Sequence, residues 1–529
     1  MTYRAPPQGR GDRRLNTTNY EHPQETNLLD LHRAMEYNGE GKPAIRILDT
    51  NTGAASNSAF GETMIVPLTP VIQLDALYNF DPREFEQFTA NGGSVQQDAN
   101  KLLFQAHTGT AAYGYGVIRS NRMARYRPGQ GMMARFTAMF DNPQAGVTLR
   151  AGLFAQEQAL VIGYNGTQFG ILRQNGGKAQ IVKLVVTSNT AGTATITLDG
   201  VTTNVTLSTT NTTTSAREIA ATAFTGWLTQ QVDNTVFFLS SMVGVRSGAN
   251  SAGGTLTGTV SVAQTGVAHT ETWTYQSEWN VDKLDGTGSS TVTLDPTKLN
   301  IFQIQFRWLG AGEIRWAIEN PLNGDLIYFH HIHYSNRNTT VHLDNPSFRI
   351  GYIAYNETNT TITDAHVSGA SMMVAIEGSI EDNVFPSAAN VTKSTLAQNT
   401  AHSLITLKNN LIFRDKINLR RVKLKNLTVA FQGQDPLIIY LILNGTFSNS
   451  HTFNKVADYS CVSKCTATGS YTMANEHTMA EFVIPINGTG SFELDQLGLV
   501  VPPNNRLDIV ISSGQSISQV SAAVTWIET

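Results

Sequence analysis

The chain has 529 residues, of which 41% are hydrophobic and 15% are charged, and its formal net charge is −4 at pH 7. This length allows roughly three to four domains with packed cores, whereas the slightly negative charge excludes the basic surface that nucleic-acid binding requires. No run of eighteen apolar residues occurs, so we expect no membrane-spanning helix.

Residues 1–74 are polar and rich in proline, arginine and asparagine, which predicts an extended N-terminal arm or anchor. The start has no apolar stretch of the kind that directs secretion, so we expect no signal peptide. Arg10-Gly-Asp12 matches a cell-adhesion tripeptide, but we favour a chance match in a segment of biased composition. The two prolines in 64–70 indicate an edge strand or an extended connector.

Residues 75–182 and 273–378 predict one β-sandwich that an insertion interrupts. The strongest signal is a strict alternation of large apolar with polar side chains, at Phe302, Ile304, Phe306 and Trp308 and again at Ile314, Trp316 and Ile318. A period of two indicates strands with one buried face and one polar face. Asn165-Gly166, between the apolar runs 159–164 and 167–173, predicts a hairpin with a type I′ turn.

Residues 183–272 have a different pattern of strand and helix signals, which predicts a small α+β insertion of the order ββαββ. Asp199-Gly200 marks a hairpin turn between two Thr-rich strands. Ser215 and Glu218 have the spacing of a capping box, so we expect a helix over about 215–229.

Residues 379–400 read as a linker, and residues 401–529 predict a second all-β domain that resembles a jelly-roll sandwich. The apolar run 437–443 is too short to span a membrane and predicts a strand buried on both faces. Cys461 and Cys465 could close a short disulfide loop, but two reduced thiols in a surface loop are the interpretation we favour.

Several short segments resemble a family of virion structural proteins from tailed phages and large DNA viruses. They are Ser58-Ala-Phe-Gly61, Asn91-Gly-Gly-Ser-Val95, Tyr126-Arg-Pro-Gly-Gln-Gly131, Gly163-Tyr-Asn-Gly-Thr167 and Phe169-Gly-Ile-Leu-Arg173. The insertion and the C-terminal sandwich are also similar to parts of such chains. The resemblance implies a lectin-like, concanavalin-type sandwich on a particle surface, often oligomeric, and it supplies no catalytic residues.

His330, His331 and His333 form the most metal-like cluster in the sequence. On a strand, His331 and His333 share one face and could ligate one ion, with His342 or Asp344 from a following strand as a partner. The alternative, which we favour here, is a set of polar residues at the rim of a sheet. We therefore expect no metal and no cofactor, with His331 and His333 as the candidates should a metal bind.

Glycoside hydrolysis would require two carboxylates that flank a groove. Glu313, Glu319 and Asp325 lie on or near predicted strands, but they lack the Glu-x-Asp-x-x-Glu spacing of sandwich glycosidases. We therefore expect no catalytic residues and no enzyme activity, with polysaccharide degradation as the least favoured alternative.

The favoured hypothesis is a virion structural protein, located on the capsid, a fibre, a spike or the tail, that serves assembly and host attachment. We expect a homo-oligomer, preferably a trimer, whose arm contacts other virion proteins. The alternative is a carbohydrate-binding receptor-recognition protein on the same scaffold, for which Tyr126 and Tyr334 are candidates to stack on host-surface glycans.

Overall fold

The computed structural model describes residues 68–81, 84–378, 386–445, 451–467, 469–471 and 478–529, together with the backbone of 35–37 and 43–45. The latter two segments form the paired strands β1 (Met35–Tyr37) and β2 (Pro43–Ile45). The predicted arm, including Arg10-Gly-Asp12, lies largely outside the described residues.

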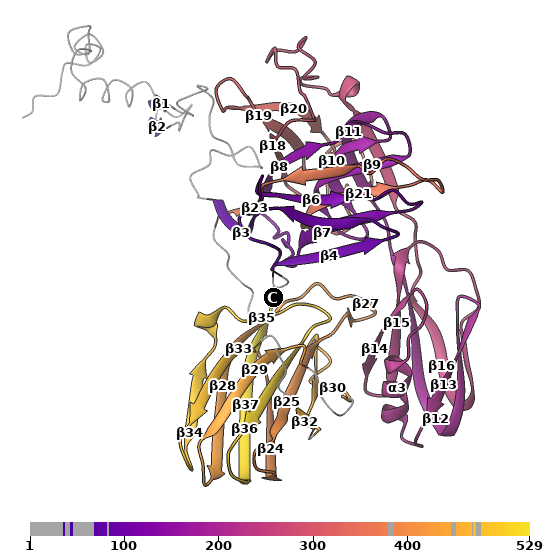
Figure 1. Cartoon of the computed structure of the whole chain (residues 1–529), viewed down its shortest axis with the longest axis vertical. Helices are drawn as coiled ribbons and strands as arrows, with labels where there is room; N and C mark the ends of the chain where they lie inside the picture. The colour runs from indigo at the N-terminus through magenta and orange to yellow at the C-terminus, as the bar shows by residue number, and fades with distance from the viewer. Residues whose placement is uncertain are drawn as a thin grey trace, which may run out of the picture. The chain divides into compact units, whose positions relative to one another are not determined.

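The described chain is mainly β and folds into two compact units (Figure 1). Of the described residues, the first unit contains those between 68 and 155, 159–173 and 271–378, and the second contains 156–158, 174–270 and those between 386 and 529. In the part of the chain that the structure describes, no helix has the length and the apolar composition needed to cross a membrane.

The first unit consists of two antiparallel sheets. One has the order β17-β11-β10-β9-β21-β7-β4. Its strands are β4 (Phe85–Ala90), β7 (Tyr115–Ser120), β9 (Val147–Phe154), β10 (Ala159–Asn165), β11 (Gln168–Asn175), β17 (Thr270–Tyr275) and β21 (Arg349–Asn356).

The other sheet has the order β20-β19-β18-β8-β22-β6-β5, and β23 joins β8 to the edge strand β3. Its strands are β3 (Leu68–Asp75), β5 (Ser94–Asp98), β6 (Leu103–His107), β8 (Met132–Phe140), β18 (Asn300–Phe306), β19 (Ile314–Glu319), β20 (Leu326–Ile332), β22 (His366–Gly369) and β23 (Ser371–Glu377). Residues 68–74 therefore belong to this sheet and not to the arm, and Pro70 lies on an edge strand, where a missing N–H is tolerated.

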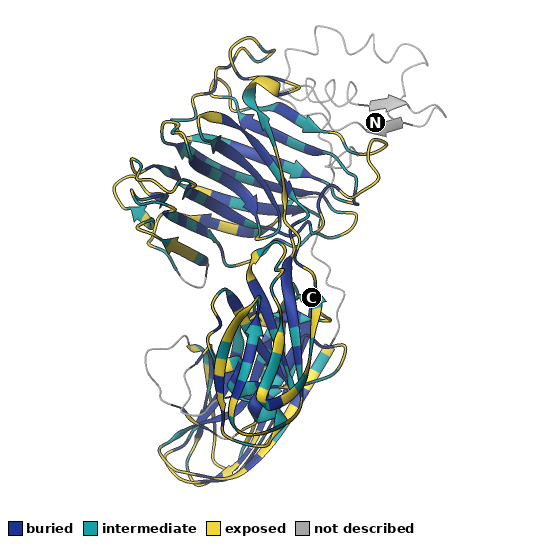
Figure 2. Cartoon of the chain, turned by 90° about the vertical axis from the view of Figure 1, so that its right-hand side faces the viewer, coloured by how far each residue is buried: buried dark blue, intermediate teal, exposed yellow. Residues whose placement is uncertain are grey.

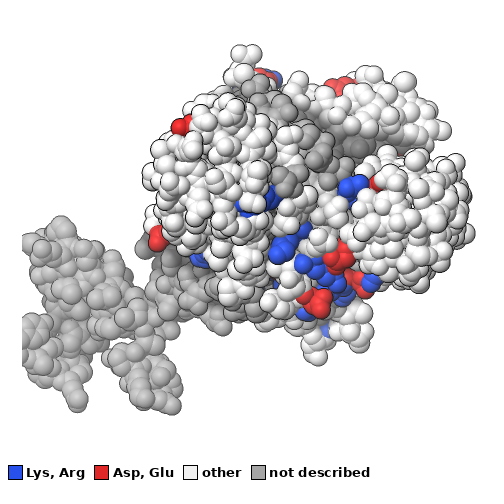
Figure 3. All heavy atoms as spheres, turned by 90° about the horizontal axis from the view of Figure 1, so that it is seen from below, with Lys and Arg blue, Asp and Glu red and all other residues white. Residues whose placement is uncertain are grey.

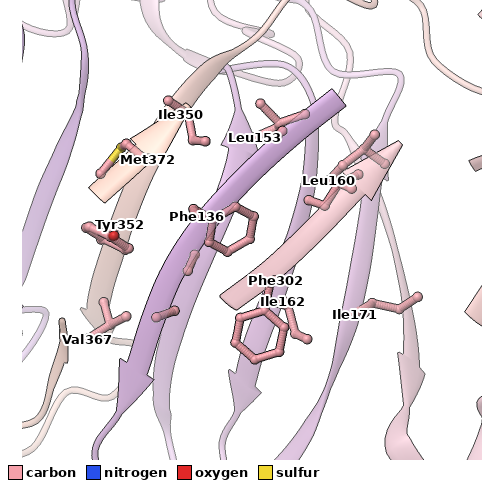
Figure 4. Close-up of a cluster of buried hydrophobic side chains, with 14 of the residues drawn as sticks. Phe136, Leu153, Leu160, Ile162, Ile171, Phe302, Ile350, Tyr352, Val367 and Met372 are labelled. Carbon is pink, nitrogen blue, oxygen red and sulfur yellow. The ribbon is translucent and has the colours of Figure 1, made fainter. Parts of the chain in front are cut away.

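The core of the first unit lies between its two sheets. Figure 4 shows side chains from both sheets in this core, among them Phe136 and Phe302 from one sheet and Ile162 and Tyr352 from the other. The Tyr352 hydroxyl donates a hydrogen bond of 2.7 Å to the Thr137 carbonyl, so the polar end of this buried ring is satisfied. The alternation predicted for β18 and β19 is confirmed at Phe302, Ile304, Phe306, Ile314, Trp316 and Ile318, which are all buried. Trp308 differs, because it lies beyond the end of β18 and is only half-buried, and Gln303 on the predicted polar face is buried as well.

The hairpin β10–β11 is confirmed, but its turn differs from the prediction. Asn165 ends β10 in register with Thr148, and the positive φ of the turn lies on Gly166, at 62°. The turn residues are thus Gly166 and Thr167, with glycine at the first central position. A glycine there suits a type II′ turn, whereas type I′ would need positive φ at both positions.

Residues 174–270 form a five-stranded sheet packed against one helix. The elements are β12 (Ala179–Leu198), β13 (Val201–Leu207), α3 (Thr212–Ala221), β14 (Trp227–Val232), β15 (Thr235–Val243) and β16 (Ser251–Gln264). The order is ββαβββ, because Trp227 begins a strand that pairs with β15 instead of ending the helix. The helix begins after Asn211, whose side chain accepts a hydrogen bond from the Thr214 N–H, while Ser215 is buried inside it. The predicted bounds 215–229 and the capping role of Ser215 are therefore wrong.

Residues 386–529 form a second sandwich of two antiparallel sheets around their own core. Figure 2 colours the strands by burial and shows buried positions interspersed with more exposed ones along them. The first sheet contains β24 (Pro386–Leu396), β28 (Val422–Gly433), β34 (Thr489–Glu493), β35 (Val500–Val501) and β37 (Ile517–Glu528). The second contains β25 (Ala401–Asn409), β29 (Leu437–Leu443), β30 (Asn454–Lys455), β31 (Val462–Cys465), β32 (Ser470–Tyr471), β33 (Thr478–Ile484) and β36 (Arg506–Ser512). A small hairpin, β26 (Ile412–Phe413) and β27 (Lys416–Ile417), stands apart from both.

Three predictions for this part need correction. Residues 386–396 are not linker, because β24 pairs with β37 along its length; the rest of the predicted linker before 386 lies outside the described residues. The run 437–443 alternates between buried and half-buried positions and is not fully buried on both faces. Cys461 and Cys465 are free thiols, but both are buried and do not lie in a surface loop.

Candidate functional site

A pocket of about 250 Å³ opens on the first unit beside the edge strand β20. Its walls come from β11, β17, β20 and the segments that follow them. The lining residues are Ile171, Arg173, Thr272, Thr274, Asn280, His330, His331, Ile332, His333 and Arg337. The lining therefore carries two guanidinium groups, three imidazoles and several hydrogen-bonding groups, with no carboxylate among these residues.

The β19–β20 hairpin determines which way the three histidines face. Arg315 of β19 stands opposite His331 and Trp316 stands opposite His330, and the register then shifts so that Phe329 is an extra residue in β20. Such a bulge interrupts the alternation of faces, so Phe329 and His330 are both buried. Beyond the bulge the period of two resumes, and His331 and His333 share a face, as the sequence predicts.

His330 is held as a neutral imidazole at the inner wall of the pocket. The backbone N–H of Asn280 donates to its Nδ1 at 3.3 Å, so that nitrogen must carry a lone pair. Burial, followed by the nearby His331 and His333, lowers the pKa of His330 to about 4. This ring can therefore donate or accept hydrogen bonds at neutral pH without bringing a charge into the pocket.

Glu313 joins His331 and His333 at the outer face of this hairpin. Its Oε1 lies 3.2 Å from Nδ1 of His331 and 3.3 Å from Nδ1 of His333. Its other oxygen, Oε2, accepts a hydrogen bond of 2.7 Å from Nε of Arg315, which fixes the orientation of the carboxylate. One ligand atom from each of the three residues lies within 4.8 Å of the other two, so the group has the composition and spacing to hold a divalent cation.

The partners that the sequence suggested for these histidines lie elsewhere. His342 is fully buried, with its ring against Tyr334, and burial lowers its pKa to about 4. Asp344 is not part of the cluster that the structure forms. The sequence does not indicate Glu313 as a partner, because the two residues come together only when β19 and β20 pair in the observed register, with Arg315 opposite His331. The signal was present in the apolar alternation of 314–318, which places Glu313 on the polar face with Arg315.

The two tyrosines predicted to bind glycans differ in their relation to the pocket. Tyr334 lies beside it, with the guanidinium of Arg173 5.5 Å from its ring centroid. Its hydroxyl is 3.2 Å from the Thr340 hydroxyl, so both ends of the side chain already have neighbours. Tyr126 does not line the pocket; its ring packs edge-on against Trp308, 5.6 Å away. Glycan stacking by either residue stays a prediction.

Glu313 and Glu319 cannot act as a pair on one glycosidic bond. Glu313 directly precedes β19 and Glu319 is its last residue, and a strand rises about 3.3 Å per residue, so their Cα atoms are roughly 20 Å apart. Glycosidases hold their two carboxylates about 5–9.5 Å apart. Asp325 belongs to the exposed turn between β19 and β20, where Asn323 donates a hydrogen bond to it.

No family model matches the chain, and no curated protein matches it in sequence. Among solved structures, the cellulose-induced protein Cip1 aligns with 57% of this chain and 96% of its own, at 11% identity and a TM-score of 0.27. A glycosyl hydrolase family protein from Mycobacterium fortuitum aligns with 58% of this chain and 99% of its own, at 8% identity and a TM-score of 0.27.

Arcelin-5, a lectin-like defence protein from Phaseolus vulgaris, aligns with 58% of this chain and 100% of its own, at 9% identity and a TM-score of 0.21. Similarity at these TM-scores decides neither the activity nor the ligand of this chain. The description of the fold rests on its own strand order and cores.

Proposed function

We propose that this chain is a structural protein on the surface of a virus particle, where it serves assembly and attachment to the host. The observation that carries the proposal is the construction of the described chain from separate β modules, each with its own buried core. The short segments that resemble virion proteins support the same proposal. The fold alone assigns no function, so the experiments below decide it.

The distribution of charge agrees with a role in assembly. On the face drawn in Figure 3, most atoms belong to uncharged residues, and acidic side chains lie beside basic ones. The net charge of −4 likewise gives no basic excess of the kind that nucleic-acid binding requires.

Immunogold electron microscopy tests the proposal. Antibodies raised against the whole chain are applied to intact particles purified from the host that carries the gene. We expect gold on the particle surface. Recovery of the chain only from the particle-free fraction would contradict the proposal.

Light scattering after size exclusion tests the oligomeric state separately. We propose a trimer, so the measured mass should correspond to three chains of 57.6 kDa. A mass of one chain at micromolar concentration would rule out a stable trimer. It would not bear on the location of the chain on the particle, which the immunogold experiment tests.

A second candidate function, which the pocket favours, is the binding of an acidic glycan. Arg173 and Arg337 can pair with a carboxylate or sulfate, and Asn280 and the two threonines offer partners for sugar hydroxyls. A glycan array tests this. We expect binding to carboxylated or sulfated saccharides and weakening by roughly 10- to 100-fold in Arg337→Ala, since a hydrogen bond to a charged group contributes about 1.5–3 kcal/mol. Equal binding of neutral and acidic saccharides would contradict it.

A further inference from the structure

The group of Glu313, His331 and His333 is more than a set of polar residues at the rim of a sheet. Nδ1 of both rings approaches the same oxygen of Glu313, at 3.2 and 3.3 Å. For metal–ligand distances of about 2.0–2.2 Å, two ligand atoms of a tetrahedral site are about 3.3–3.6 Å apart. The distances from Oε1 of Glu313 to the two Nδ1 atoms are therefore close to those between ligand atoms of a tetrahedral site.

The surroundings of the group also suit a metal ligand set. Arg315 holds Oε2 of Glu313 and leaves Oε1 turned toward the two imidazoles. Groups that orient a ligand in this way are a regular part of metal sites.

The ligand atoms of the group select the kind of cation. Among the described residues, the group offers one carboxylate and two imidazole nitrogens, and the carboxylate is also paired with Arg315. Ca²⁺ and Mg²⁺ require several oxygen ligands and fit this set poorly. A cation that binds imidazole nitrogen strongly, such as Zn²⁺, fits it well.

We propose that Glu313, His331 and His333 form a binding site for a divalent cation of the zinc type. His331 and His333 also line the pocket, so a cation held by them would be reached from it. Three protein ligands with one open position is the arrangement that leaves room for water or for an oxygen of a bound molecule. This inference does not depend on the location of the chain on a particle.

Titration calorimetry of the whole chain with ZnCl₂ at pH 7.5 tests the site, because both imidazoles must be neutral to bind. The test variants are His333→Ala, which removes the most exposed ligand, and Glu313→Gln, which keeps the size of the side chain. The control is His366→Ala, since His366 is also paired with a carboxylate in the same unit, through Asp141 at 2.6 Å.

We expect one Zn²⁺ per chain in the wild type and in the control, and affinity at least tenfold weaker in both test variants. Co²⁺ offers an independent measurement, because a tetrahedral site gives intense visible absorption that His333→Ala should abolish. The proposal is overturned if the wild type binds Zn²⁺ no more tightly than His333→Ala. It is equally overturned if binding is lost in His366→Ala and kept in His333→Ala.

Discussion

Trp316 of β19 stands directly opposite Ile304 of β18, and both side chains are almost completely buried. This cross-strand pair lies in the middle of the alternating run that the sequence marks most clearly. It belongs to the core between the two sheets of the first unit, so the stability of the unit that carries the pocket depends on it.

We predict that Trp316→Ala destabilises the first unit by about 3–5 kcal/mol, through the loss of a large buried ring and the cavity left behind. Leu322→Ala, in the turn of the neighbouring hairpin, is the control, because Leu322 is 79% exposed and such changes cost at most about 0.5 kcal/mol. Urea unfolding measures both values. Equal midpoints for the two variants would reject the assignment of Trp316 to the core.

Trp316→Phe should cost less than Trp316→Ala. In the described chain the indole Nε1 is buried without a hydrogen-bond partner, so phenylalanine removes an unsatisfied donor while it keeps most of the apolar surface. The same urea experiment decides this point. A loss as large as that of the alanine variant would mean that the indole N–H has a partner that stabilises the fold.

Gln230 of β14 exchanges two hydrogen bonds with the backbone of Ile412 in the small hairpin. Its Nε2 donates to the Ile412 carbonyl at 3.2 Å, and the Ile412 N–H donates to its Oε1 at 2.8 Å. All these groups are buried, so Gln230→Ala should destabilise the second unit by about 1–3 kcal/mol. Hydrogen exchange at the Ile412 amide should become faster, whereas the exposed Gln519→Ala should leave it unchanged.

Acid should weaken the first unit through His342. Its pKa in the folded chain is about 4, against 6.5 for a free imidazole, because of burial. Between these values the unfolded chain binds more protons, so stability is complete above pH 6.5 and is lost as the pH falls toward 4. The loss from this group is roughly 3 kcal/mol at most. His342→Gln should flatten that part of the pH profile, measured by urea unfolding; an unchanged slope would contradict the shift.

The local patterns predicted the fold well where one signal dominated. The mainly β class is confirmed, and the alternation over 302–318 matches β18 and β19, because large apolar side chains at every second position can be buried only on one face of a sheet. The sequence predicts the helix at about the right place but with wrong bounds. Asn211 and not Ser215 caps the helix. Trp227 lies in β14, which pairs with β15, and the helical pattern of a sequence does not reveal such a contact between strands.

The candidate site could be predicted only in part. The period of two correctly places His331 and His333 on one face, but the third member, Glu313, is brought to them by the register of the β19–β20 hairpin. The bulge at Phe329 was also invisible in the sequence, although it decides that His330 is buried. Registers and bulges depend on contacts between strands, so a single sequence does not record them.

A three-dimensional map of intact particles by cryo-electron microscopy tests the central claim most directly. We predict surface density that accommodates the sandwich of the first unit, with antibody fragments against residues 84–155 and 271–378 bound at the same position. Particles whose entire surface density is explained by other chains, and which bind no such fragment, would contradict it.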